Sequence, residues 1–394
     1  MNRPFTKNAV LLALSGIANV SIASVGIYPT GYGTQAQGMG GAGIAVGESA
    51  LAPAGNPAGI AFSGDRLDVG TGLFITNDGA QQDGKSYPAK TGIAPLPEFG
   101  YVKALSPSFV VGVASWAAGA AVNYGYPYGE IPGNSKTYSQ AIFAHVAPTI
   151  AYRFGANGDN AIAISAVGAM STISVGGIEA QTGLPNQGRD WKPGYGIKVG
   201  WLSRLTPQVS VGAFYASKIY YQPWSKYSHI FADGGRFQEP EQYGAGIALR
   251  PTQKLLLAFD WIRFNFRNTR GLGNPLNFSA APGAINGSGT GFANINAYRF
   301  GVQYAMTDRL TLRAGFEMAN QLLTSDNTAL TFIIPATVNR TYTIGATYHF
   351  ANKSDLSLAY GVSPRVQVNG TGMSAGTNPY MRVNFISVGY SRKF

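Results

Sequence analysis

The sequence contains no cysteine among its 394 residues, and this absence excludes both disulfide bonds and thiol chemistry. Charged residues make up only 12% of the chain, and no apolar run reaches the roughly 18 residues that a transmembrane helix needs. The three histidines, His145, His229 and His349, stand far apart and give no metal-ligand spacing. We therefore expect no metal, no cofactor, and a fold held together by hydrogen bonds and packing.

Glycine and aromatic residues are abundant instead, with 52 Gly, 22 Tyr and 21 Phe. With a mean hydropathy of +0.01, this composition is typical of a β-barrel whose strands face lipid on one side and a lumen on the other. A formal net charge of +11 can indicate nucleic-acid binding, but the basic residues form no cluster. We predict no nucleic-acid partner and attribute the charge to contact with anionic outer-membrane lipid, including lipopolysaccharide.

The first 23 residues have the three-part layout of a secretory signal peptide. Arg3 and Lys7 give a positive start, and residues 9–22 form an apolar run too short to span a bilayer. Ser21 and Ala23 are the small residues of a cleavage site, so we predict cleavage after Ala23 and export of the chain. A buried N-terminal helix is the alternative.

Apolar and polar residues alternate with a period of two from about residue 66 onward, which predicts β-strands. In residues 254–267, Leu257 and Phe259 alternate with Asp260, so we place the odd positions toward lipid and Asp260 in the lumen. About fourteen strands are predicted, at residues 66–76, 97–105, 109–121, 142–154, 161–174, 193–204, 208–221, 241–250, 254–267, 296–306, 308–319, 339–351, 354–362 and 382–394.

The connections between these strands alternate in length, short after every even-numbered strand and long after every odd-numbered one. Outer-membrane barrels have this arrangement, with short periplasmic turns and long extracellular loops. In lipid every backbone N–H and C=O must be paired, so the sheet has to close on itself. We predict an all-β protein, an antiparallel barrel in the outer membrane of a Gram-negative bacterium with both termini periplasmic. A soluble β-sandwich is the alternative.

The last residues alternate again, with Ile386, Val388 and Tyr390 leading to Phe394. This ending resembles the assembly signal of bacterial outer-membrane proteins, so we expect the outer-membrane assembly machinery as a partner. The barrel is predicted to comprise residues 65–394 and to be a monomer.

Residues 31–62 differ from the rest of the chain, because they carry one formal charge, Glu48, and are rich in glycine. Glycine disfavours regular secondary structure, and Pro53 and Pro57 interrupt it. The segment cannot build a core of its own, yet it is too apolar for a solvated linker. We predict that residues 24–64 pack inside the barrel.

Four stretches carry a family resemblance: residues 38–46, 56–61, 240–261 and 335–350. They are similar to sequences of the FadL family, the outer-membrane transporters of long-chain fatty acids and hydrocarbons. The most specific element is Asn56-Pro57-Ala58-Gly59, which matches the family's N-terminal signature. The resemblance implies a fourteen-stranded barrel whose lumen holds an N-terminal hatch, with these four residues as gating elements. A merely structural plug is the alternative.

The resemblance also implies passive uptake, in which a hydrophobic small molecule binds near the outer loops and enters the barrel. In the family, exit is thought to run sideways beside an inward kink in the third strand. The corresponding strand here contains Trp116 and Gly119 within a run of small residues, which could bend and leave a lateral gap. A strand that is weakened only locally is the alternative.

A carboxylate ligand would need a cation in the lumen, because burying an unpaired carboxylate is costly. Alternation places Lys198, Lys218, Arg299 and Arg313 on the lumen face, and we take them as candidate ligand contacts. Such cations are also commonly hydrated or paired, and Arg313 is within reach of Glu317 or Asp260 in the same reading.

The loops at residues 222–240 and 320–338 carry large apolar side chains, which are costly on a solvated surface. They suit a groove that collects a hydrophobic ligand, although loops that cap the barrel and pack on each other would have the same composition. The candidate contacts are Trp224, Phe231, Leu322, Leu323 and Phe332.

Two motifs that resemble enzyme sites lack the required context. Residues 79–86 have P-loop spacing but are followed by Pro88 rather than a helix. Residues 372–376 match a nucleophile elbow but lie in a glycine-rich loop. We predict no enzyme activity and favour transport of hydrophobic small molecules. A general porin, or a structural or adhesive outer-membrane protein, is the alternative, and the identity of the substrate stays open.

Overall fold

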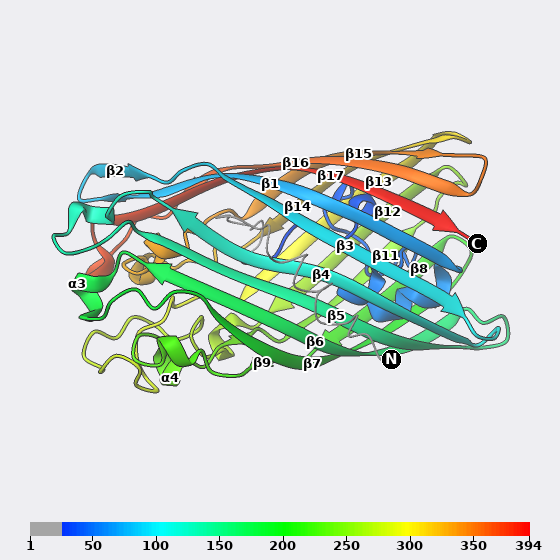
Figure 1. Ribbon diagram of the computed structural model, residues 1–394. Coiled ribbons are helices and arrows are strands. Elements are labelled where there is room, and N and C mark those ends of the chain that lie inside the picture. The colour runs from blue at the N-terminus through cyan, green and yellow to red at the C-terminus, as the bar shows by residue number, and fades with distance from the viewer. Residues whose placement is uncertain (1–25) are drawn as a thin grey trace, which may run out of the picture.

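The computed structural model describes residues 26–394, and the predicted signal peptide, residues 1–23, lies outside the described residues. The chain forms a closed antiparallel barrel of 14 strands, which confirms the predicted fold class (Figure 1). Within residues 26–394, no helix is long and apolar enough to cross a membrane. The strands are β1 (Arg66–Gln82), β2 (Lys85–Pro88), β3 (Gly92–Ala104), β4 (Phe109–Asn123), β5 (Tyr138–Phe154), β6 (Asn160–Gly176), β7 (Asp190–Arg204), β8 (Val209–Ala216), β9 (Ile219–Tyr221), β10 (Gln238–Glu239), β11 (Gln242–Leu249), β12 (Leu255–Phe264), β13 (Ile295–Thr307), β14 (Leu310–Ala319), β15 (Arg340–His349), β16 (Ser354–Gln367) and β17 (Thr377–Lys393).

Each wall strand pairs with the next in chain order, and β17 closes the ring by pairing with β1. Three short strands continue the wall rather than adding to it: β2 extends the line of β3 along β1, β9 extends β8, and β10 extends β11. Closure leaves no sheet edge, which a barrel in lipid requires.

The connections alternate in length as predicted, so short turns lie at one end of the barrel and long loops at the other (Figure 1). The long-loop end carries the short helices α3 (Glu179–Thr182) and α4 (Ala232–Gly235). Several strands run further toward this end than predicted, and β1 continues to Gln82 instead of ending at residue 76. Residues 77–82 are mostly polar or glycine on both faces, so alternation could not reveal this part of the strand, which pairs with β17 and β2.

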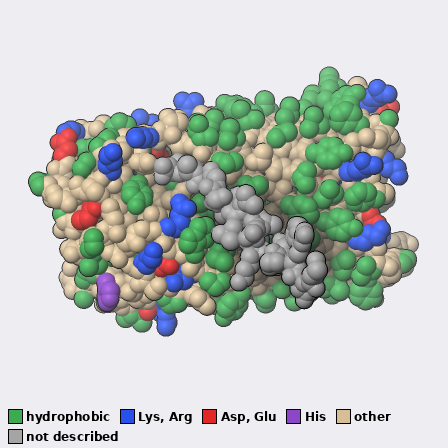
Figure 2. Space-filling view, in the orientation of Figure 1, with side chains coloured by type: hydrophobic (Ala, Val, Ile, Leu, Met, Phe, Trp, Pro, Cys, Tyr) green, Lys and Arg blue, Asp and Glu red, His purple; other side chains and the backbone are tan. Residues whose placement is uncertain are grey.

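Large apolar side chains cover the outside of the barrel. Ile93, Ile162 and Ile344 are between 50% and 61% exposed, and aromatic residues such as Tyr348 and Phe350 stand beside the short turns. Apolar side chains gather over the half of the barrel nearer the short turns, with charged residues at the rim (Figure 2). A surface of this kind is stable in a bilayer and costly in water.

The N-terminal segment, defined here as residues 26–64, lies inside the barrel near the short turns (Figure 1). It contains α2 (Thr34–Gln37) and two short 3₁₀ helices, η1 (Ala52–Ala54) and η2 (Pro57–Phe62). It packs directly onto lumen-facing glycines, since a Cβ atom added to any of them would come within 3.1 Å of one of its atoms. These glycines are Gly100, Gly200, Gly212, Gly246, Gly301, Gly315, Gly345 and Gly389. The lumen wall is therefore shaped to hold backbone against backbone.

Candidate functional site

One seam of the barrel is incomplete. Residues 99–104 of β3 pair with residues 110–115 of β4, but further along, β4 pairs only with β5 among the described residues. The two strands meet again near the long-loop end, where the Lys90 N–H donates to the Asn123 carbonyl at 2.8 Å. We call residues 92–98 and 116–122 the interrupted seam.

The interrupted seam contains the residues that were predicted for a lateral opening. The Gly119 N–H turns away from β3 and donates to the Ile27 carbonyl of the N-terminal segment at 3.0 Å. Ala117 belongs to the same buried apolar cluster as Ala94 and Leu96 of β3, so apolar side chains line the stretch where the two strands separate. Trp116 marks the start of the divergence and stacks on His145 with ring centroids 5.1 Å apart.

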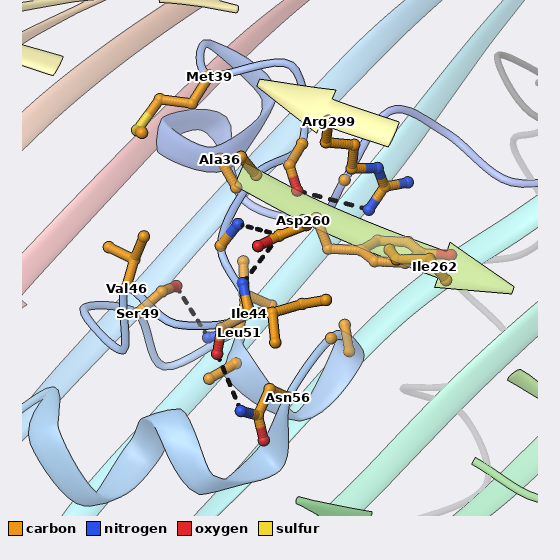
Figure 3. Close-up of a pocket in the computed structure, with 18 of the residues that line it drawn as sticks. Ala36, Met39, Ile44, Val46, Ser49, Leu51, Asn56, Asp260, Ile262 and Arg299 are labelled. Carbon is orange, nitrogen blue, oxygen red and sulfur yellow. Dashed lines mark hydrogen bonds between the residues drawn. The ribbon is translucent and has the colours of Figure 1, made fainter. Parts of the chain in front are cut away.

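A cavity of about 110 Å³ lies between the N-terminal segment and the lumen faces of β8, β11, β12 and β13 (Figure 3). Its lining is mainly apolar, with Met39, Ile44 and Leu51 from the segment facing Phe214 and Ile262 from the barrel. An apolar cavity of roughly 150 Å³ accommodates benzene. The space is thus on the scale of a single aromatic ring.

Charged side chains at this cavity hold the N-terminal segment in place. Asp260 Oδ2 accepts hydrogen bonds from the backbone N–H groups of Gly43 at 2.7 Å and Ile44 at 3.0 Å (Figure 3). Arg299 forms a 2.7 Å ion pair with Glu317, and Glu317 also accepts a hydrogen bond from the Thr30 hydroxyl. Hydrogen bonds to a carboxylate are about twice as strong as neutral ones, so these contacts anchor the segment firmly.

Two further lumen carboxylates anchor the segment from the other wall. Glu98 on β3 accepts a hydrogen bond from the Gly33 N–H at 2.9 Å. Asp68 on β1 accepts one from the Ala50 N–H at 2.8 Å and another from the Ser49 hydroxyl. Anchors therefore come from β1 and β3, on one side of the interrupted seam, and from the wall that carries Asp260.

The matched signature residues Asn56, Pro57, Ala58 and Gly59 are all buried at the start of η2. The Asn56 amide accepts a hydrogen bond from the Ala58 N–H at 3.1 Å. It donates to the carbonyls of Ile44 and Trp201, both at 2.9 Å. One side chain thus caps a turn and ties two parts of the segment to β7, which is a defined structural role; the gating role stays a prediction.

The four predicted cations differ in their surroundings. Lys198 is buried, donates to the Ala54 carbonyl at 2.6 Å, and lies 5.4 Å above the Trp116 ring. Arg299 and Arg313 are buried in the lumen as alternation predicts, but Glu317 pairs with Arg299 and not with Arg313. Lys218 is half-exposed and donates to the Asn268 carbonyl, because the break between β8 and β9 interrupts the alternation at this point.

The predicted loop residues are mostly buried and pack on each other. Trp224, Leu322 and Leu323 join one cluster, in which Trp224 stacks on Phe237 at 4.5 Å. Half-buried Phe231 packs against this cluster. Phe332 is buried separately and stacks on Tyr128 with centroids 4.4 Å apart. The side chains therefore fill the long-loop end of the barrel and do not form an exposed groove. This arrangement matches the alternative in which the loops cap the barrel and pack on each other.

Sequence reasoning missed a buried polar network above the cavity. Glu239 contacts His145 at 2.8 Å and accepts hydrogen bonds from Tyr221 and from Tyr28 of the N-terminal segment. Burial and the nearby Glu239 carboxylate raise the pKa of the Tyr28 hydroxyl well above its ordinary value, so it remains a donor. Alternation alone would have placed His145 in the lumen, but Glu239 follows a loop and gives no such signal.

The motifs that resemble enzyme sites remain isolated. Residues 79–86 cover the end of β1, the turn at residues 83–84 and the start of β2, and residues 372–376 lie in the loop before β17. Among residues 26–394, no group of three His, Asp or Glu side chains is placed to hold a metal ion.

Comparison with solved structures finds the same architecture in several channels, whereas no family model and no curated protein matches the sequence. The Pseudomonas putida toluene transporter TodX aligns with a TM-score of 0.67 at 17% identity, covering 96% of this chain and 100% of its own. The Ralstonia pickettii toluene transporter TbuX gives 0.64 at 16% identity, with coverages of 93% and 99%. A Pseudomonas aeruginosa FadL homologue gives 0.68 at 14% identity, with coverages of 96% and 100%.

The chain has the fold of these transporters. The similarity extends over nearly the whole chain, so the fold that the FadL resemblance implied is confirmed. At such low identity the alignment establishes the fold alone, and function has to be argued from the geometry of this lumen.

Proposed function

We propose that this protein is an outer-membrane transporter for passive uptake of hydrophobic small molecules, either long-chain fatty acids or hydrocarbons. The observation that supports this best is the interrupted seam, where β4 leaves β3 and binds the N-terminal segment through Gly119. A barrel that only conducts ions or anchors the cell surface gains nothing from two adjacent strands that separate within the membrane, because the ladder between them is lost there.

The proposed path enters among the apolar loops, passes the single-ring cavity, and leaves sideways through the interrupted seam into the membrane. Ala94, Leu96 and Ala117 are the only barrier that we assign to the seam on the lumen side, and all three are apolar. A hydrophobic molecule that crosses there avoids the polar headgroup layer, which explains why a lateral exit suits this class of ligand.

We propose that Lys198 binds the carboxylate of an acidic ligand. Its ammonium group has three N–H donors, and among the described residues its contacts are the Ala54 carbonyl and the faces of the Trp116 and Phe214 rings. Donors left over next to two aromatic rings suit a carboxylate with an apolar tail. Arg299, paired with Glu317, is less suited to this role.

We further propose that the N-terminal segment is a hatch that blocks aqueous flow. The Gly315 position tests this, because a Cβ atom there would lie 2.0 Å from the Gly40 backbone nitrogen. Gly315→Ala should displace the segment and raise ion conductance in planar bilayers. Gly168→Ala is the matched control, since its Cβ would meet nothing closer than 3.5 Å. Equal conductance in both variants would count against a plug.

Uptake into liposomes tests the function as a whole. Purified protein should carry oleate or toluene into the vesicles and exclude a polar sugar. Sugar flux without binding of either hydrophobic compound would instead indicate a general porin. Faster uptake of the charged oleate than of toluene would identify fatty acids as the substrate class, and the reverse would identify hydrocarbons.

A further inference from the structure

A second cavity, of about 280 Å³, opens at the short-turn end of the barrel. It lies between the end of the N-terminal segment and the barrel wall, and we call it the mouth cavity. Its charged lining residues are Arg66, Arg204, Arg313, Lys393, Glu48 and Asp355. Cations thus outnumber carboxylates by four to two in this lining, not counting His349.

The carboxylates of the mouth cavity are already engaged. Glu48 accepts a 2.6 Å hydrogen bond from Arg250, which stands outside the cavity lining. Asp355 contacts His349 Nδ1 at 2.7 Å. Arg66 is engaged as well, since its Nε lies 2.8 Å from Asp68.

The other three cations have no carboxylate within 4.0 Å among the described residues. Arg313 is only 7% exposed, and its guanidinium donates to two neutral groups, the Gln303 amide oxygen at 2.7 Å and the Thr347 hydroxyl at 2.6 Å. Arg204 lies 4.3 Å above the Phe62 ring. Glu48 and Asp355 attract Arg313 only from beyond 4.0 Å, and a buried guanidinium without a directly paired counter-charge is costly, so an anion would stabilise this arrangement.

We infer that the mouth cavity binds a small oxyanion, a carboxylate or a phosphate group. Arginine presents paired N–H donors that match these groups, and Arg313 and Arg204 supply them from two different walls. Glu48 and Phe62 belong to the N-terminal segment, so a bound oxyanion would lie against both the segment and the barrel. This site is distinct from the 110 Å³ cavity and does not depend on the proposed function.

Calorimetric titration of the full chain in a non-ionic detergent tests the site, with inorganic phosphate as the probe at low ionic strength. Wild type should show saturable binding, and Arg313→Gln and Arg204→Gln should each weaken it by about tenfold, as expected for one charge-assisted contact. Arg309→Gln is the matched control, because Arg309 is exposed in the turn before β14 and does not line the cavity. Arg204 is exposed, so its variant tests the site even where loss of buried Arg313 impairs folding.

A parallel titration with dihexanoyl phosphatidylglycerol distinguishes the source of the oxyanion. Binding of phosphate assigns the site to free anions, and binding of the lipid alone assigns it to a lipid headgroup; either outcome with a selective loss in the two cavity variants supports the inference. No saturable binding of either probe, or the same loss in Arg309→Gln, overturns it. Failure of the liposome uptake assay would leave this titration unaffected.

Discussion

Two seams of the same barrel, separated by the paired strands β1 and β3, are built in opposite ways. At the closing seam, β1 pairs with β17 along all 17 of its residues, and Phe74 stacks on its partner Phe385 inside the barrel. At the interrupted seam, two strands further along the ring, the ladder stops after residues 99–104 and β4 turns inward. The barrel is therefore fully paired where the ring closes and loses pairing only between β3 and β4, so an opening there would leave the closing seam intact.

The comparison predicts the largest loss of stability at the closing seam. Phe385→Ala removes a fully buried ring and should lower the free energy of unfolding by about 3–5 kcal/mol. Urea unfolding in lipid vesicles measures this. Phe350→Ala, on the lipid-facing side, is the control and should cost much less because that ring is 43% exposed. Similar losses at both positions would mean that the closing seam has no special role.

Filling the interrupted seam should block transport while leaving the barrel intact. In Ala117→Trp, the indole adds bulk to the buried cluster that contains Leu96 and Ala94, and uptake of toluene into liposomes should fall by about tenfold, or about 1.4 kcal/mol of barrier. Ala346→Trp adds the same side chain on the lipid face of β15 and should transport normally. Unchanged uptake in Ala117→Trp would contradict a lateral exit.

Lys198, which lies over the Trp116 ring at the start of the interrupted seam, should distinguish an acidic ligand from a neutral hydrocarbon. Lys198→Met keeps much of the apolar stem and removes the charge, so uptake of oleate should fall by about fivefold while that of toluene stays within about twofold, in line with one charge-assisted hydrogen bond. Parallel uptake assays provide the ratio. An equal loss for both compounds would show that Lys198 is structural.

The smallest expected effect is a difference in hydrogen exchange between backbone amides of β3 and β1 in the unsubstituted protein. Among residues 92–98 of β3, the backbone positions that point away from β1 are Ile93, Pro95 and Pro97, and only Ile93 carries an N–H. Its amide has no strand partner among the described residues, so it should exchange faster than the amides of β1, which is paired on both sides. Hydrogen–deuterium exchange by mass spectrometry resolves the two segments. Equal protection would indicate that the interrupted seam is closed in solution.

Much of the fold could be predicted from the sequence, because lipid imposes a strict rule on every strand. Alternation located Asp260, Arg299 and Arg313 in the lumen and gave the approximate strand number, and the lengths of the connections indicated a membrane barrel. The rule fails where strands break or leave the membrane, which is why Lys218 was misplaced and the end of β1 was missed.

The candidate site was less predictable, since its contacts join residues that are far apart in the chain. The run of small residues after Trp116 indicated a bend, but only the register shows that pairing stops at Ser115. Apolar loop residues such as Trp224 were predicted to collect ligand, and their burial depends on packing between loops that have no periodicity. In the sequence the lumen glycines look like ordinary strand residues. Only the structure shows that the N-terminal segment lies directly against them.

The closing seam also constrains the order in which this molecule can be assembled. β17 is the last strand of the ring, and the N-terminal segment precedes the first, yet strands all around the circumference hold that segment by hydrogen bonds. A finished ring offers no route for threading a chain that is fixed on so many sides. The segment must therefore enter while the sheet is still open. The carboxylates that bind it would then guide the curvature of the sheet as the barrel closes.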